Sequence, residues 1–301
     1  MQILNFPFPT PPEPAALLAA EQCLVSLSAL VPNASATSLK RASESQLELT
    51  PLGRAMAAFP LSPRHSRMLL EAATLVATDS APDDVLPYSL ALAAALSAEA
   101  PFVHSDSLLQ QSSDNPPSKQ ALDAAALKRQ RVALDNANNT LRNKARSAHH
   151  RLRTPHSDAI SALNALIAFE AQPVGKRPEF CRDNFLHVAN LNEMSALRVQ
   201  LVRILRTKMS LEGGAVSGHA GAAFLLRRSQ AEGVTGGPTR LDALLQPPGV
   251  AVSTVLRRCL VAGWADQVAR RMRSAEYVSQ SNAEKGPRAV RYQVRLPTNK
   301  Y

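Results

Sequence analysis

Apolar residues recur at helical spacing along most of this sequence, and prolines or polar stretches separate one run from the next. The chain holds 22 prolines and 12 glycines and few β-branched runs, which favours short helices joined by turns over a sandwich or a large parallel sheet. Two hydroxyl residues each precede a proline, Thr50-Pro51 and Ser62-Pro63, a pattern typical of a helix cap and the first helical residue. We therefore predict helices around 51–58 and 63–77.

Similar periodicity predicts helices along the rest of the chain, and only two segments alternate as a strand would. The segment Asp83 to Glu99 is almost solid in Ala and Leu, whereas residues 101–155 turn polar and then basic. The further predicted helices lie at 17–31, Asp83 to Glu99, Gln120 to Ala145 and 160–167, in a short stretch from Glu179, at Leu191 to Arg206, and up to about residue 276. The predicted extended pieces are Leu47 to Leu49 and Val290 to Val294, so the expected fold is mainly α.

Charge is unevenly distributed along the chain. Residues 1–100 hold 5 Lys or Arg and 9 Asp or Glu, whereas residues 101–301 hold 29 and 15. Such a basic majority indicates a surface that faces a polyanion. A solubilising surface or a solvated basic linker explains the same numbers, and charge alone does not separate these interpretations.

Several functional classes lack their signatures. The cysteines, Cys23, Cys181 and Cys259, are odd in number and too far apart for a CxxC pair, which argues against a disulfide scaffold or a local zinc site. The longest apolar stretch, Leu90 to Leu96, is too short to span a membrane, and the N-terminus lacks the basic start of a signal peptide. We therefore expect a chain in a reducing compartment with no membrane segment.

Catalytic motifs are also missing. There is no GxxxxGK[ST] phosphate-binding loop and no GxSxG nucleophile elbow. No cysteine or carboxylate completes a metal-binding set at ligand spacing with His149, His150 and His156. The adjacent His156, Ser157 and Asp158 cannot form a spaced nucleophile, base and orienting group, and we expect Asp158 to cap the helix that follows it. We thus predict no catalytic, cofactor or metal residues in this chain.

Several sequence blocks, taken in order, resemble the C-terminal accessory region of DEAH-box RNA helicases. The first two are NFPFPTPP (Asn5 to Pro12) and LELTPLGRAMAAFPLSPRHSRMLL (Leu47 to Leu70), similar to the exit from the second motor domain and to the winged-helix domain. HSDAISALNALIAFE (His156 to Glu170) and FCRDNFLHVANLNEMSALRVQL (Phe180 to Leu201) resemble the ratchet-like domain. AGWADQVARR (Ala262 to Arg271) and RAVRYQV (Arg288 to Val294) resemble the lead into the OB-fold.

This resemblance implies a domain order and a cellular role. The expected parts are an exit segment (1–13), a winged-helix domain (14–100), a basic and partly disordered insertion (101–155) outside the resemblance, a ratchet-like helical bundle (156–276) and a truncated OB-fold start (277–301). ATP and Mg²⁺ would enter only through motor domains that this chain lacks, and we expect a fragment of a larger protein. The sequences of these blocks most resemble the branch of the family that works in ribosome biogenesis, and this resemblance implies rRNA processing in the nucleolus.

In that family the ratchet-like and OB domains form a wall for single-stranded RNA, so cations on these segments are the candidates for binding RNA or pre-rRNA. The candidates are Arg182, Asn184, Arg198, Arg203, Arg206 and Arg291. Each could equally be a solvated position or part of an intramolecular ion pair, and Phe185 fits the core better than a stacking site. The alternative function is a noncatalytic module that docks a glycine-patch-type activator or an assembly factor. A DNA-binding winged-helix regulator fits poorly, because that block is acidic.

Overall fold

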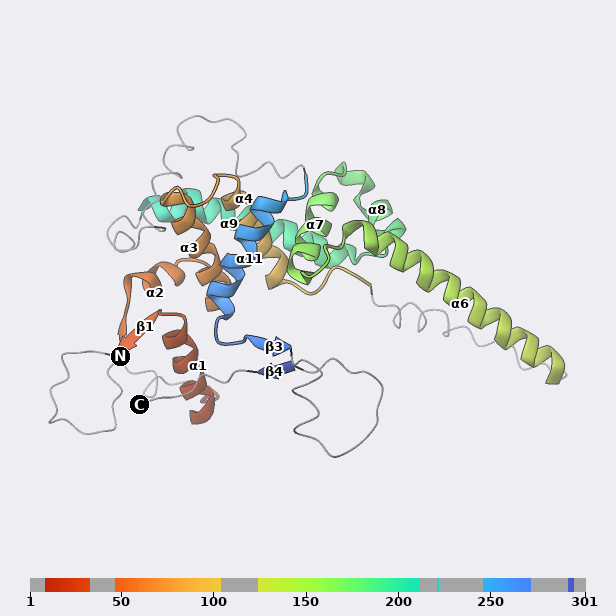
Figure 1. Cartoon of the computed structure of the whole chain (residues 1–301), viewed down its shortest axis with the longest axis horizontal. Coiled ribbons are helices and arrows are strands. Elements are labelled where there is room, and N and C mark those ends of the chain that lie inside the picture. The colour runs from red at the N-terminus through yellow and green to blue at the C-terminus, as the bar shows by residue number, and fades with distance from the viewer. Residues whose placement is uncertain are drawn as a thin grey trace.

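The computed structural model describes residues 9–32, 47–103, 124–211, 221, 246–271 and 292–294, and these residues are predominantly helical (Figure 1). The prediction of a mainly α fold is confirmed. The helices are α1 (Pro14–Ser26), α2 (Pro51–Met56), α3 (Pro63–Ala77), α4 (Val85–Ser97), α6 (Ala124–Leu152), α7 (Asp158–Glu170), the 3-10 turn η2 (Val174–Lys176), α8 (Arg177–Asp183), α9 (Val188–Leu211) and α11 (Val250–Trp264).

Helix α4 lies at the centre of the core. Its Ala- and Leu-rich sequence is apolar on every side, and from Leu90 to Ala95 each side chain is buried. A helix of this kind is stable only when other helices surround it. α3, α7, α9 and α11 all pack against α4, and one continuous cluster of buried side chains joins these helices. The predicted winged-helix segment and the predicted ratchet-like segment therefore share a core, and the boundaries at 100 and 156 remain predictions.

Helix starts follow the local signals in the sequence. The Thr50 side chain accepts a hydrogen bond from Gly53 N (2.9 Å) at the start of α2, and Ser62 accepts one from His65 N (3.3 Å) at the start of α3. At α7 the predicted cap is wrong. Ser157, not Asp158, has extended backbone and accepts the bond from Ile160 N (3.2 Å). Asp158 is the first helical residue, where its negative charge interacts favourably with the positive end of the helix dipole.

Two short antiparallel hairpins lie at the edges of the helical core. β1 (Leu30–Pro32) pairs with β2 (Leu47–Leu49), with Leu30 opposite Leu49 and Pro32 opposite Leu47. β3 (Ala269–Arg271) pairs with β4 (Tyr292–Val294), with Ala269 opposite Val294. The predicted strands at Leu47 to Leu49 and Val290 to Val294 are confirmed where they are described, whereas the prediction of helix to about residue 276 is wrong at β3. Assignment of the second hairpin to an OB-fold start remains a prediction.

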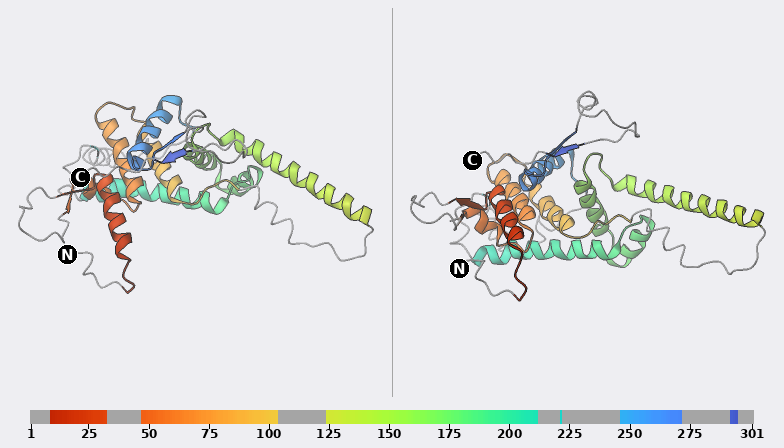
Figure 2. Two further views of the ribbon diagram at one scale, coloured as in Figure 1. Left: turned by 60° about the horizontal axis from the view of Figure 1, so that its bottom comes forward. Right: turned by 90° about the horizontal axis from the view of Figure 1, so that it is seen from below.

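The first helix and the helix of the basic segment differ in length from their predictions. The predicted helix 17–31 ends at Ser26, because the chain turns at Ser28 (φ 60°) and Val31 enters β1. The helix predicted within the basic segment is longer, running from Ala124 to Leu152, and it extends away from the packed helices (Figure 2). Among the helices that the structure describes, none is both long enough and apolar enough to cross a bilayer.

Candidate nucleic-acid interface

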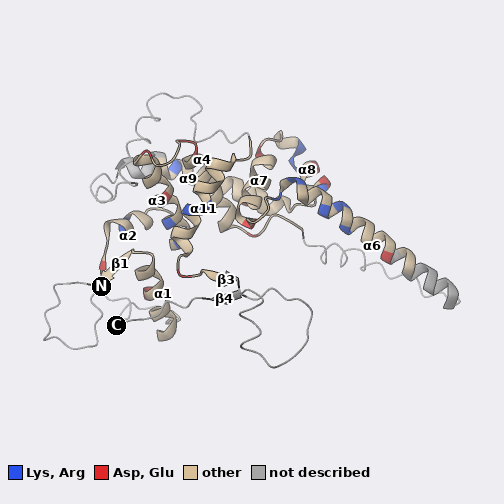
Figure 3. Ribbon diagram, viewed as in Figure 1, with Lys and Arg blue, Asp and Glu red and all other residues tan. Residues whose placement is uncertain are grey.

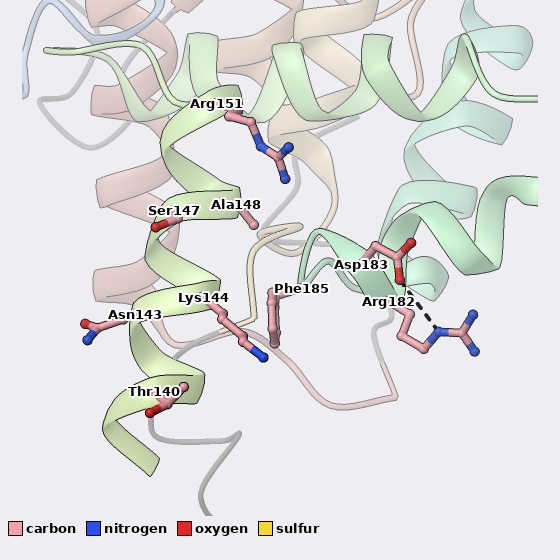
Figure 4. Close-up of a pocket in the computed structure, with 9 residues that line it drawn as sticks. All are labelled: Thr140, Asn143, Lys144, Ser147, Ala148, Arg151, Arg182, Asp183 and Phe185. Carbon is pink, nitrogen blue, oxygen red and sulfur yellow. Dashed lines mark ion pairs between the residues drawn. The ribbon is translucent and has the colours of Figure 1, made fainter. Parts of the chain in front are cut away.

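A groove lies between the C-terminal half of α6 and the end of α8. It encloses about 920 Å³. α6 contributes one side, and the last residues of α8 with the turn that follows contribute the other (Figure 4). The lining residues are Thr140, Asn143, Lys144, Ser147, Ala148, Arg151, Arg182, Asp183 and Phe185. We call this feature the α6–α8 groove.

The α6 side of the groove carries its cations two helical turns apart. Lys144 and Arg151 are seven residues apart, so at 3.6 residues per turn they project from nearly the same side of the helix. Ala145 and Ala148, between these two cations, are buried, and α6 packs against α7. In Figure 4, Lys144 and Arg151 extend toward the space between the two helices, and the Phe185 ring lies across from Lys144.

The opposite side is built by the end of α8. The Phe185 N–H donates to Arg182 O (3.3 Å) and the Leu186 N–H donates to Cys181 O (2.8 Å), which together form a Schellman motif. The carbonyl of Phe185 is in turn held by two donors, His149 Nε2 of α6 at 2.9 Å and the Val103 N–H at 3.0 Å. α6, α8 and the segment before residue 104 are therefore tied together at one backbone position.

The charge of the α6–α8 groove is positive. Three cations, Lys144, Arg151 and Arg182, face one acid, Asp183. The Arg182–Asp183 contact is long (Nε to Oδ1, 3.9 Å), and both side chains are largely exposed, so it neutralises little of that charge. Lys and Arg positions gather on this end of α6 and on α8 (Figure 3). An anion would meet several donors and little repulsion here.

The residues predicted to bind RNA fall into different places. Arg182 lines the groove, and Asn184 lies beside it, accepting a hydrogen bond from Arg151 Nη2 (3.4 Å) through its Oδ1. Arg203 is exposed on α9 and is not among the lining residues. The side chain of Arg206 and the whole of Arg291 lie outside the described residues.

Arg198 is held within the protein. Its Nη2 lies 2.8 Å from Glu170 Oε2, and its Nε donates to Glu170 Oε1 at 3.0 Å. The Ser195 hydroxyl donates to the same Oε1 at 2.8 Å. The side chains of Arg198 and Glu170 are 10% and 9% exposed, so this pair joins α7 to α9 in the interior. The structure thus favours the intramolecular ion pair that the sequence left open for this residue.

Arg182 is the one lining residue that was among the predicted candidates, and the groove residues Lys144, Arg151 and Phe185 were not. Lys144 and Arg151 belong to the basic segment, where a count of charges does not show which cations share one side of the helix. Their spacing of seven residues is the sequence signal that could have placed them on the same side. Phe185 was assigned to the core, and that prediction is wrong. The residue is half-buried, stands outside the core cluster and lines the groove.

Among the described residues, no three His, Cys, Asp or Glu side chains come together as a metal site. His149, the most buried of the three histidines considered for such a site, instead bonds to the Phe185 carbonyl and meets the Phe102 ring edge-on at 5.0 Å between centroids.

Comparison with known families defines the class of this chain. Residues 20–61 match the family described as helicase associated domain (HA2), winged-helix, and residues 62–162 match helicase associated domain (HA2), ratchet-like. The two matches meet at residue 61, and the second covers residues 101–155, which the sequence resemblance left out.

The relatives with similar sequences are RNA helicases. The chain is 33% identical over 281 residues to the ATP-dependent RNA helicase DEAH13 of Arabidopsis thaliana, covering 92% of this chain and 20% of that protein. It is 31% identical over 291 residues to the human probable ATP-dependent RNA helicase DHX37, covering 95% and 21%. The yeast probable ATP-dependent RNA helicase DHR1 is 29% identical over 276 residues, covering 89% and 18%.

The chain therefore carries the winged-helix and ratchet-like helicase associated domains of the DEAH-box RNA helicases. It spans about one fifth of the length of the relatives it matches.

Proposed function

We propose that this chain is an RNA-binding accessory region of a DEAH-box RNA helicase, which holds single-stranded RNA and gates its passage. In this proposal ATP and Mg²⁺ are bound by motor domains of the helicase and not by the residues of this chain. The observation that carries the proposal is the cationic α6–α8 groove in a chain whose helicase associated domains match those of RNA helicases.

The chemistry of the groove suits a phosphate backbone. Ammonium and guanidinium groups meet phosphate oxygens without selecting a base, and an RNA helicase needs such contacts because it handles many sequences. The cations of the groove are exposed, so they would exchange condensed counterions for phosphates, and binding should weaken steeply as salt rises.

The first test is the salt dependence of RNA binding. Fluorescence anisotropy of a labelled oligouridylate is measured with the purified chain between 50 and 300 mM KCl (about sixfold in salt). For three neutralised phosphates the log of the association constant should fall with log salt at a slope of about −2. Absence of binding at the lowest salt, or affinity that does not change with salt, would contradict the proposal and favour a protein-docking module.

The second test concerns the motor. The chain alone should show no RNA-stimulated ATP hydrolysis. Turnover that copurifies with the chain through successive columns, and that a control preparation lacks, would refute this part of the proposal.

A role in rRNA processing in the nucleolus belongs to the same proposal. It rests on the sequence blocks that resemble the ribosome-biogenesis branch of the family. Crosslinking of the tagged helicase to RNA in cells, followed by sequencing, should recover pre-rRNA. Recovery of messenger RNA alone would contradict this assignment. A glycine-patch-type activator would be sought among proteins that copurify with the chain after nuclease treatment.

A further inference from the structure

Three described helices end on a residue other than glycine in the left-handed conformation. Ser28 follows α1 (φ 60°), Asp79 follows α3 (φ 51°) and Phe185 follows α8 (φ 53°). Glycine is the usual residue at this position because a Cβ is unfavourable there, and a bulky side chain is more unusual than a short polar one. Phe185 is therefore the exceptional member of this set.

Core packing does not explain the phenylalanine. Its side chain is half-buried and stands outside the cluster of buried residues that forms the core. It lines the α6–α8 groove instead, with its ring across from Lys144 in Figure 4. Unfavourable backbone conformations persist where the surroundings impose them, and they gather at functional sites. The His149 and Val103 donors on the Phe185 carbonyl, together with the two hydrogen bonds of the Schellman motif, hold Phe185 in this conformation.

The cations of the groove have a spacing that suits more than one phosphate. Lys144 and Arg151 lie seven residues apart, or about 10.5 Å along the α6 axis at 1.5 Å per residue. A stacked strand covers that distance in about three nucleotides at 3.4 Å each. Arg182, whose side chain is 76% exposed, adds a cation at the rim on the opposite side.

We propose that the α6–α8 groove is a binding site for single-stranded RNA in which Lys144 and Arg151 contact phosphates and the Phe185 ring stacks on an unpaired base. This inference rests on the proposed RNA-binding function and assigns it to one site. It selects a single strand because a base within a duplex has both faces covered by its neighbours and offers none to an aromatic ring.

The experiment compares variants of the full chain in the anisotropy assay with oligouridylate. The groove variant is Lys144→Gln/Arg151→Gln, and the matched control is Arg146→Gln/Arg257→Gln, which removes the same charge from exposed positions that do not line the groove. Loss of two phosphate contacts should flatten the salt slope by about 1.4 in the groove variant only. Equal slopes in both variants would overturn the site assignment.

The ring is tested by Phe185→Leu, which keeps an apolar side chain without a stacking face, and should weaken binding about tenfold. Phe185→Gly relieves the backbone conformation, so its melting temperature is measured together with its affinity. Asp79→Gly is the matched control, since it makes the same backbone change at an exposed position after α3. Weaker binding by the Phe185 variants, with unchanged binding by Asp79→Gly, is the expected result.

The outcomes separate this inference from the proposed function. If the unchanged chain binds oligouridylate and every groove variant binds equally well, RNA binding stands and the groove is not its site. If the unchanged chain does not bind, the proposed function fails and the site assignment fails with it. Equal affinity for a blunt RNA duplex and for oligouridylate would overturn the stacking role of Phe185.

Discussion

The pair of Arg198 and Glu170 provides the sharpest test of the internal packing. The Glu170 side chain is 9% exposed, and replacing Arg198 by Leu removes its two guanidinium contacts, at 2.8 and 3.0 Å, so that among the described residues only the Ser195 hydroxyl still donates to the carboxylate. Leaving one member of a buried pair without its partner costs about 3–5 kcal/mol of the free energy of unfolding. An exposed pair would cost less than about 1 kcal/mol. The buried position of the pair predicts the larger loss.

Urea unfolding followed by circular dichroism, and by the fluorescence of Trp264, the single tryptophan, measures this loss. The double variant Glu170→Leu/Arg198→Leu removes both charges and should recover a large part of the lost stability, because no carboxylate remains buried. A single variant as stable as the unchanged chain, or a double variant as unstable as the single one, would refute the reasoning. RNA affinity measured where both proteins are folded should be unchanged.

Three further predictions concern the contact between α3 and α11. Gly263→Ala would place its Cβ 2.6 Å from Arg64 O, so it should destabilise the fold by about 1–3 kcal/mol, whereas Gly249→Ala, with no atom within 4 Å, should cost little in melting temperature. Burial raises the pKa of Cys259 to about 12, so its thiol should resist alkylation at pH 8 until urea unfolds the chain. The hydrogen bond from Arg64 holds the pKa of Asp266 below its usual value. The contribution of the Asp266 carboxylate to stability is therefore complete above its pKa in the unfolded chain, about 3.9, and is lost as the pH falls through its lower pKa in the folded chain. In Asp266→Asn the free energy of unfolding should fall less steeply with pH than in the unchanged chain, measured by equilibrium unfolding from pH 5 down to pH 2 (about 1000-fold in proton concentration).

The elements that could be predicted from the sequence are those whose signals are local. α3 begins and ends as predicted at residues 63 and 77, because Ser62 and Pro63 fix its start and an apolar face fixes its period. β3 was missed because the short segment Ala269–Arg271 becomes a strand only through pairing with β4, about twenty residues later in the chain. Pairing between strands that far apart in the chain does not show in the local spacing of apolar residues.

The candidate site was less predictable for the same reason. Arg182 was found because it belongs to a recognisable block, but the groove also needs Lys144 and Arg151 from a helix about 30 to 40 residues earlier in the chain. Arg198 and Glu170 are 28 residues apart, and only the packing of α7 on α9 brings them together. Likewise, the composition around Phe185 suggests a core residue, and only the left-handed turn after α8 directs its ring into the groove.

The length of α6 has a mechanical consequence. Among the α6 side chains that the structure describes, burial begins at Ala145, and the helix from Ala124 to Lys144 extends about 31 Å from that base. A helix of this kind acts as a lever. A rotation of about 10° at the base, where the α6–α8 groove lies, would move the far tip by about 5 Å. Any rotation of α6 at the groove would therefore be amplified at a surface far from the groove.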